Sequence, residues 1–361
     1  MKNTFGNAIS LTIFGESHGS HIGAVIDGIA PGIKIDTDYI NACLDLRKPH
    51  GKISTARREE DEFQIISGEF NGYTTGTPLT ILIENTSKKG CDYDSIKDTP
   101  RPGHADYTAQ CKYHGFQDYR GGGHFSGRIT AALVATGAIL KKALEDKGIF
   151  IGTHISYLGG IKDDAITSED DVIALSKKHF PTVSSKIEEM MREKIEKARE
   201  AGDSIGGILE SYVYGMPAGV GEPFFDSLES VLSHILFSIP GIKGVEFGAG
   251  FGFKDLPGSQ ANDGFEVNNG VVVTKTNNNG GINGGISNGM PIVFRCAVKP
   301  TPSIYTEQQT FNLSEGKNTK ITIKGRHDPA IIHRARAVVD AAAAIAIADM
   351  LTVRYGTDYL K

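Results

Sequence analysis

The sequence lacks tryptophan, long hydrophobic runs and any close spacing of its few cysteines. No segment approaches the roughly 18 apolar residues that would cross a bilayer, and the first residues lack the apolar core of a signal peptide. The four cysteines, at positions 43, 91, 111 and 296, are too far apart for a CxxC zinc or redox motif. We therefore expect a cytoplasmic protein with reduced thiols and no membrane segment.

An excess of basic charge is also missing. The 38 lysines and arginines are interspersed with 43 aspartates and glutamates, for a net charge of −5. This balance predicts no nucleic-acid-binding face, so that any anion site must be local. Hydrophobic residues make up 39% of the chain, which is sufficient for a large core. A chain of 361 residues could form two domains, although α+β enzymes of this size often fold as one unit.

Glycine, by contrast, is abundant, with 44 residues against an average frequency of roughly 7%. The glycines form short runs without a three-residue period, which excludes collagen and indicates tight turns. The glycine- and asparagine-rich segment 276–289 is either a linker or, as we favour, a loop that lines a ligand site.

Hydrophobic patterning predicts strands and a few long helices. The helices are expected at 127–147, 184–201 and 329–354, the last alanine-rich and apolar nearly all round, as in a core helix. Because helices and strands do not alternate regularly, the pattern favours an α+β fold. The strands are expected at 8–14, 23–29, 79–83, 149–158, 208–214, 271–274, 292–298 and 320–324.

Two histidines stand in glycine-flanked turns. His18 lies in GESHG at 15–19, directly after a predicted strand, and His104 lies in RPGHAD at 101–106, between an arginine and an aspartate. A histidine there could transfer protons near neutral pH, although each motif alone could equally be a structural turn. His18 and His21 have HxxH spacing, but no third ligand lies nearby in the sequence, so we expect no metal site.

Three further segments could bind anions. The glycines of RGGGHFSGR, at 120–128, precede a predicted helix and could offer backbone N–H groups to a phosphate. The basic stretch is either a solvated loop or a set of anion clamps, and comprises Arg47, Lys48, Lys52, Arg57 and Arg58. The segment KPTPS, at 299–303, ends a strand with a cation and hydroxyls. Asp328, in RHDP, could be a helix N-cap or a base.

The order of these motifs resembles the chorismate synthase family along essentially the whole chain. Besides those already named, the matching segments are SGEFNGYTTGTP from Ser67, DYRGGG from Asp118, GDSIGG from Gly202, MPAGVGEPFFD from Met216, GGISNG from Gly284 and GRHDP from Gly325. The resemblance implies a single domain over residues 1–361, with a β-α-β sandwich of long helices layered between antiparallel sheets, and a homotetramer.

The resemblance also implies a reaction, the anti-1,4-elimination of phosphate from 5-enolpyruvylshikimate 3-phosphate to give chorismate. Reduced FMN is required without net redox change. NADPH is implied only if the enzyme reduces its own flavin, and a separate flavin reductase would otherwise be a partner. An alternative is a metal-dependent phosphohydrolase using His18, His21, His104 and Asp106, and a second is a catalytically silent flavin-binding protein.

The family pattern implies a role for each matching residue. His18 would protonate the leaving phosphate, His104 the reduced flavin, and Asp328 would accept a proton. The implied substrate contacts are Ser17, Arg47, Lys52, Arg101, Ser126, Arg128 and Arg326. The implied FMN contacts are His104, His124, Phe125, Ser126, Gly241, Gly284, Lys299, Pro300, Thr301, Pro302, Ser303 and Arg326.

This sequence departs from the family pattern at three places. His124-Phe125 replaces Arg-Ser after the triple glycine, Lys52 stands where arginine is usual, and Pro240-Gly241 replaces Asn-Ala. A lysine at position 52 would contact an anion as a point charge rather than as a two-pronged clamp.

Overall fold

The computed structural model describes residues 2–51, 53–54, 59–86, 97–323 and 327–361. Four residues of the predicted anion sites, Lys52, Arg57, Arg58 and Arg326, lie outside these ranges. Within them, no helix is both long enough and apolar enough to cross a membrane.

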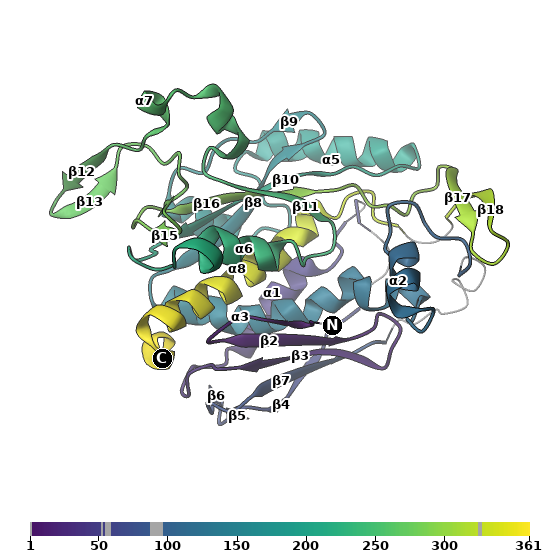
Figure 1. The fold of residues 1–361 in the computed structure, drawn as a ribbon, viewed down its shortest axis with the longest axis horizontal. Coiled ribbons are helices and arrows are strands. Elements are labelled where there is room, and N and C mark those ends of the chain that lie inside the picture. The colour runs from purple at the N-terminus through teal and green to yellow at the C-terminus, as the bar shows by residue number, and fades with distance from the viewer. Residues whose placement is uncertain (1, 52, 55–58, 87–96, 324–326) are drawn as a thin grey trace.

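One antiparallel sheet forms the lower layer in Figure 1. Its strand order is β1-β2-β3-β7-β4. Alternate residues of β3 and β7 are buried, including Ile22, Ala24, Ile81 and Ile83, so one face of the sheet points into the core. The strands are β1 (Thr4–Phe5), β2 (Ser10–Gly15), β3 (His21–Asp27), β7 (Leu79–Glu84) and β4 (Phe63–Ser67).

A second antiparallel sheet forms the upper layer, with the order β11-β16-β10-β8-β9. Glu210 on β10 pairs laterally with His154 on β8 and with Arg295 on β16. The strands are β11 (Ile242–Phe247), β16 (Ile292–Val298), β10 (Gly207–Tyr214), β8 (Phe150–Leu158) and β9 (Ile161–Lys162).

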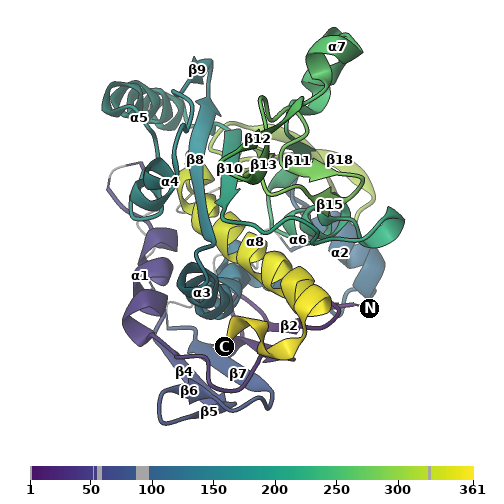
Figure 2. The ribbon, with the colours of Figure 1, turned by 90° about the vertical axis from the view of Figure 1, so that its left-hand side faces the viewer.

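Three helices lie between the sheets, namely α1 (Thr37–Arg47), α3 (Thr130–Asp146) and α8 (Ile332–Tyr355) (Figure 2). α3 packs on β3 and β7, while α8 packs on β8, β10 and α3. A Cβ added at Gly137 of α3 would lie 2.6 Å from the Cβ of Ala341 and 2.7 Å from its carbonyl oxygen. The two helix backbones therefore nearly touch, which the alanine-rich sequence of α8 permits.

The remaining elements cover the edges of this sandwich. The helices are α2 (Asp106–Tyr113), α4 (Glu169–Leu175), α5 (Ser185–Glu200), α6 (Leu228–Leu236) and α7 (Gly258–Ala261). The strands form four hairpins: β5 (Glu69–Phe70) with β6 (Tyr73–Thr74), β12 (Phe265–Asn268) with β13 (Val271–Thr274), β14 (Ile282–Asn283) with β15 (Ile286–Ser287), and β17 (Gln308–Asn312) with β18 (Lys317–Ile321).

The α+β fold, with helices layered between antiparallel sheets, is confirmed. Each predicted strand and helix overlaps an observed one. The shorter helices α1, α2, α4, α6 and α7 were not predicted. For α6 a signal was present, since Ser227 caps its first turn by accepting from the backbone N–H of Ser230.

Candidate active site

The loop that carries His18 is fastened to the triple-glycine turn. It follows β2, and Ser17 and His18 are buried. The backbone N–H of Ser17 donates to the carbonyl oxygen of Gly123 at 3.0 Å. His124 Nδ1 lies 2.8 Å from the carbonyl oxygen of Gly15, so this nitrogen carries a proton and donates. The two motifs therefore form one unit.

The glycines of this turn provide contact surfaces for both predicted histidines. Gly121, Gly122 and Gly123 have φ angles of 60°, 85° and 53°, in the left-handed region that favours glycine. A Cβ at Gly121 would overlap the His18 ring and lie 2.9 Å from Ser17 Oγ, and one at Gly122 would lie 3.3 Å from His104 Nε2. The Nδ1 edge of His18 and the Nε2 edge of His104 thus face adjacent residues.

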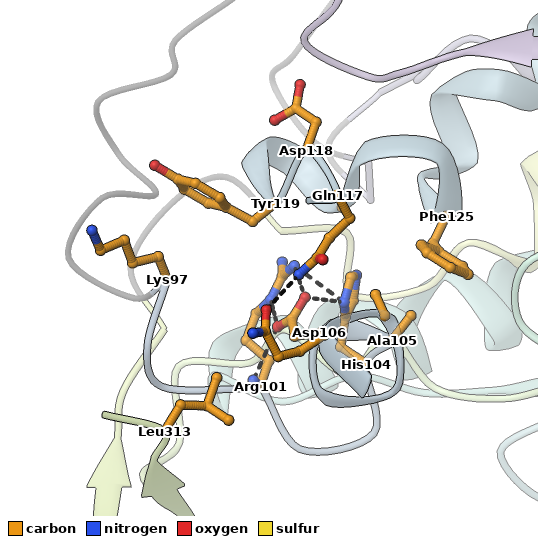
Figure 3. Close-up of a pocket in the computed structure, with 13 residues that line it drawn as sticks. Lys97, Arg101, His104, Ala105, Asp106, Gln117, Asp118, Tyr119, Phe125 and Leu313 are labelled. Atoms are coloured by element: carbon orange, nitrogen blue, oxygen red, sulfur yellow. Dashed lines mark hydrogen bonds and ion pairs between the residues drawn. The ribbon is translucent and has the colours of Figure 1, made fainter. Parts of the chain in front are cut away.

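Asp106, the first residue of α2, orients His104. Its Oδ1 lies 2.6 Å from His104 Nδ1, and its two oxygens accept from Arg101 Nε and Nη2 at 2.8 Å each (Figure 3). Burial alone would raise the pKa of Asp106, but the bonds from Arg101 and His104 outweigh it and hold that pKa far below its usual value. An ionised Asp106 keeps the proton on Nδ1, which leaves Nε2 as the basic nitrogen of His104.

Arg47 and Arg128 are joined by one buried carboxylate. Arg47 Nη2 donates to Asp61 Oδ2 at 2.7 Å, and Arg128 Nη1 donates to Asp61 Oδ1. Burial would raise the pKa of Asp61, but the two guanidinium groups more than compensate and lower it. Arg128 also donates to Asn85 Oδ1 at 2.8 Å and to the carbonyl oxygen of Glu84 at 3.0 Å. Both predicted clamps are therefore rigidly placed.

A solvent-open cavity with about 500 Å³ of free space adjoins His104 (Figure 3). Gly122 lines one wall, and Phe125, which is 37% exposed, adds an aromatic surface. The polar and charged lining residues are Lys97, Arg101, His104, Asp106, Gln110, Gln117, Asp118 and Tyr119.

The predicted flavin segment, residues 299–303, approaches the His104 turn from the other sheet. Lys299 follows β16, and its Nζ donates to the carbonyl oxygen of Gly103. Its backbone N–H donates to the carbonyl oxygen of Gly241 at 2.9 Å. Pro302 lies 3.5 Å from the position of a Cβ added at Gly103. Ser303 is buried. The structure therefore brings Lys299 and Pro302 to the turn that holds His104, with Gly241 bonded to the backbone of Lys299.

Asp328 does not cap a helix, so that alternative is wrong. α8 begins at Ile332, with Ile331 at the N-cap position. Asp328 Oδ2 instead accepts from Arg334 Nη1 at 2.7 Å, and Arg334 Nε donates to the carbonyl oxygen of Arg47 at 2.9 Å. Burial and then the positive charge of Arg101 lower the pKa of the neighbouring His327. Asp328 thus belongs to a segment that lies near Arg101 and is tied to Arg47.

Two of the predicted contacts differ from the others: Gly284 lies away from the histidines, and Ser126 positions another residue of the site. Gly284 lies in the turn between β14 and β15, on the opposite side of Figure 1 from α2, and a Cβ added there would meet no atom within 4 Å. The structure does not bring it to the histidines. Ser126 Oγ accepts from the backbone N–H of Arg128 at 3.3 Å and so helps to position Arg128.

Sequence reasoning missed the carboxylates that organise the site. Asp106 was predicted only as a possible metal ligand, and Asp61 was not predicted to have a role. Asp118, which holds Arg120 through two hydrogen bonds of 2.8 and 2.9 Å, was not singled out. These carboxylates lie close in the sequence to Arg101, Arg120 and the basic stretch. This proximity could have predicted their role, because clustered cations need counter-ions when they are buried.

Comparisons with known proteins agree on one family. The family model described as chorismate synthase matches residues 9–352. The chain is 48% identical to a chorismate synthase of Pyrococcus abyssi and 46% identical to one of Thermococcus gammatolerans, in each case over 97% of both chains. A solved structure described as a crystal structure of chorismate synthase superposes with a TM-score of 0.77 at 27% identity, covering 98% of this chain and 94% of that one. These relatives give no support to a metal-dependent phosphohydrolase.

Proposed function

Because this chain belongs to the chorismate synthase family, whose members are lyases, we propose that it eliminates phosphate from 5-enolpyruvylshikimate 3-phosphate to give chorismate. The observation that carries the proposal is the placement of His18 and His104 on adjacent glycines of one turn. Two proton-transferring groups are thereby held side by side, with Arg101 beside one of them and a cavity next to it.

The substrate side of this proposal needs donors for a phosphate and two carboxylates. Ser17 Oγ and Arg47 Nε are buried and have no hydrogen-bond partner among the described residues. A buried donor without a partner costs free energy, so both are ready to bind an oxyanion. With Arg128 fixed by Asp61 nearby, we assign Ser17, Arg47, Arg101, Ser126 and Arg128 to the substrate site. Lys52 and Arg326, outside the described residues, are assigned to it by the family pattern alone.

The cofactor proposed is reduced FMN. Thr301 Oγ1 is buried without a partner in the described part of the chain, and Lys299 supplies a cation beside it. Phe125, with its exposed ring, and His104 line the cavity described above, so the residue types of these segments fit a ring system that carries a phosphate. Bound reduced FMN would lend an electron while phosphate leaves and recover it as hydrogen leaves. NADPH is needed only if this enzyme reduces its own flavin. Otherwise a separate flavin reductase is needed as a partner.

Three residues would handle protons. His18, which is buried and packed against the glycine turn, would donate a proton to the departing phosphate. His104 would take up and pass on a proton through its basic Nε2, because Asp106 keeps the other ring proton on Nδ1. Asp328 would accept a proton at N5 of the flavin, with Arg334 orienting its carboxylate. His124, Phe125, Gly241 and residues 299–303 are proposed as flavin contacts, whereas Gly284, which lies away from the histidines in this chain, is assigned by the family pattern alone.

The deciding experiment is an anaerobic incubation of the purified protein with chemically reduced FMN and 5-enolpyruvylshikimate 3-phosphate. We expect chorismate absorbance to rise, whether or not a chelator is present, and oxidised FMN to support no turnover. Absence of chorismate under these conditions would show that the proposal is wrong.

The two histidines can be tested separately. His18→Ala and His104→Ala should each lower kcat by about 10²-fold or more, as expected for lost acid-base catalysis. His21→Ala changes an exposed histidine at the start of β3 and serves as the control. Near wild-type turnover in both site variants would contradict the assigned roles.

We further propose that residues 1–361 form a single domain that assembles as a homotetramer in the cytoplasm. One cluster of buried residues includes side chains from both sheets and the helices between them, which supports a single domain. Phe224, Phe225 and Phe251 are at least 80% exposed, which supports an interface between copies of the chain. The free thiols of Cys43, Cys111 and Cys296 suit a reducing compartment. No nucleic acid or membrane partner is proposed.

A further inference from the structure

A second group of titratable side chains lies outside the cavity, where α1 ends. Asp45 is in the last turn of α1, His50 follows that helix, and His179 comes from the segment between α4 and α5. Figure 2 shows α1, α4 and α5 along one side of the molecule. None of the three residues has a part in the proposed reaction.

Their ligand atoms converge. Asp45 Oδ2 lies 3.6 Å from His50 Nε2 and 3.4 Å from His179 Nε2, and the two imidazole rings are 3.8 Å apart between centroids. One ligand atom from each residue lies within 4.8 Å of the others. We propose that Asp45, His50 and His179 form a binding site for a divalent transition metal of the zinc type.

The donor set selects the class of metal. Two imidazole nitrogens and one carboxylate oxygen suit Zn²⁺ and its neighbours, whereas Mg²⁺ and Ca²⁺ prefer oxygen ligands alone. The side chains of Asp45, His50 and His179 are 47%, 38% and 43% exposed, so water can complete the coordination. Zn²⁺ bound between the three side chains would displace the protons on the two Nε2 atoms that now face Asp45.

The surroundings hold the ligands in place. Phe180, next to His179, is 2% exposed and stacks on His333 at 5.8 Å, while Arg192 lies 4.4 Å from the Phe180 ring centroid. On the other side, His50 Nε2 lies 3.1 Å from the carbonyl oxygen of Asp45. Negative potential at the carboxyl end of α1 favours a cation there and offsets the charge of Arg192. The site is therefore largely formed before metal arrives.

A metal here would cross-link two segments that are distant in sequence. It would fix the end of α1 two residues before Arg47, which reaches Asp61 and the candidate active site. Because the ligands leave the cavity untouched, we expect a structural role, in which the metal stabilises the fold without taking part in the reaction. The inference does not depend on the proposed function.

Calorimetric titration of the chelator-treated full-length protein with ZnCl₂ tests the site. We expect one tight site per chain, and a rise in Tm of at least about 2 °C at a zinc concentration about 100 times Kd. His50→Gln and His179→Gln should each weaken zinc binding by about 10-fold or more, which reduces the rise in Tm at the same zinc concentration by about half or more. The control His21→Gln, which alters an exposed histidine elsewhere, should behave as wild type.

Anomalous diffraction at the zinc edge, from wild-type crystals soaked in ZnCl₂, gives a readout independent of variant folding. A peak between Asp45, His50 and His179 is expected. The proposal is overturned if the peak lies elsewhere or is absent, or if both glutamine variants fold and bind zinc as tightly as the wild type. The three side chains would then form only a hydrogen-bonded cluster.

Discussion

Gly121 and Gly122 hold left-handed backbone directly beside the rings of His18 and His104. A side chain at either position would meet both an unfavourable φ and an occupied space. The positions of the two imidazoles therefore depend on residues with no side chain of their own.

Gly121→Ala tests this dependence, with Gly148→Ala as its match. Both glycines have positive φ, but a Cβ at Gly148 would meet no atom within 4 Å. Each variant should lose about 1–2 kcal/mol of unfolding free energy from backbone strain. Only Gly121→Ala should also lower kcat, by about 10-fold or more, because it displaces His18. Chemical denaturation and steady-state assays measure the two effects, and equal losses of kcat in the two variants would contradict the role given to the contact.

Asp106→Asn tests the orientation of His104. The amide can offer its N–H₂ to Nδ1 and so place the ring proton on Nε2, the wrong nitrogen. We expect kcat to fall by about 10²-fold with a smaller change in KM, measured against the exposed control Asp164→Asn. An unchanged kcat would mean that Arg101 alone orients the ring.

For single residues, the sequence predicted the two histidines but not the carboxylates that organise the site around them. His18 and His104 stand in short motifs whose residues can be read together. The role of Asp61 depends on Arg47 and Arg128, which come from other segments and meet only in the folded chain. Asp328 shows the same limit, since its helix-cap alternative was excluded only by where α8 begins.

Among the elements, the second sheet carries a ladder of charged side chains across four strands. Glu246 on β11 accepts from Arg295 on β16 at 2.6 Å, and Arg295 donates to Glu210 on β10 at 2.9 Å. His154 on β8 lies 3.1 Å from Glu210 and 2.9 Å from Asp163. Lateral pairing of these positions fixes the register of the strands.

This ladder predicts a pH-dependent stability. Burial would lower the pKa of His154, but hydrogen bonds to Asp163 and Glu210 outweigh it and raise the pKa. A raised pKa in the folded state means that the contribution is complete below the unfolded value of about 6.5 and is lost as the pH rises through the folded pKa.

His154→Gln should therefore cost about 3 kcal/mol of unfolding free energy near pH 6, because two buried carboxylates lose their charged partner. The difference from wild type should shrink as the pH rises. Urea denaturation at several pH values measures both, with the exposed His21→Gln as control. A constant difference across the pH range would show that His154 is not charged in the folded protein.

Elements with a sustained hydrophobic pattern could be predicted from the sequence, whereas the shorter helices could not. The strand β8 and the helices α3, α5 and α8 have sustained apolar or amphipathic patterns. By contrast, α2 buries a single residue, Ala109, so its sequence carries almost no periodic signal. The order of strands within each sheet depends on pairings between distant segments, and it became visible only in the structure.

For the whole molecule, the exposed aromatic residues bear on assembly. Phe225 is 92% exposed before α6, and the β12–β13 hairpin projects from the body in Figure 1 with Phe265 and Val267 at 64% and 72% exposure. A two-stranded hairpin is marginally stable alone, so contact with another copy would explain its apolar side chains.

Phe225→Asp should accordingly lower the molar mass measured by light scattering from about four chains to fewer, because burial of a charge opposes association. Phe116→Asp, which changes a phenylalanine of 93% exposure next to α2, is the matched control. If the wild type is a tetramer and Phe225→Asp has the same mass, the interface lies on another surface.

The near contact of Gly137 with Ala341 sets the thickness of the sandwich at its centre. The candidate site draws residues from the ends of both sheets, since His18 follows β2 of the lower sheet and Lys299 follows β16 of the upper one. A larger residue at this crossing would push the two helices apart, and with them the two sheets that they separate. Two small residues that face no ligand therefore help to set the distance between the two parts of the candidate site.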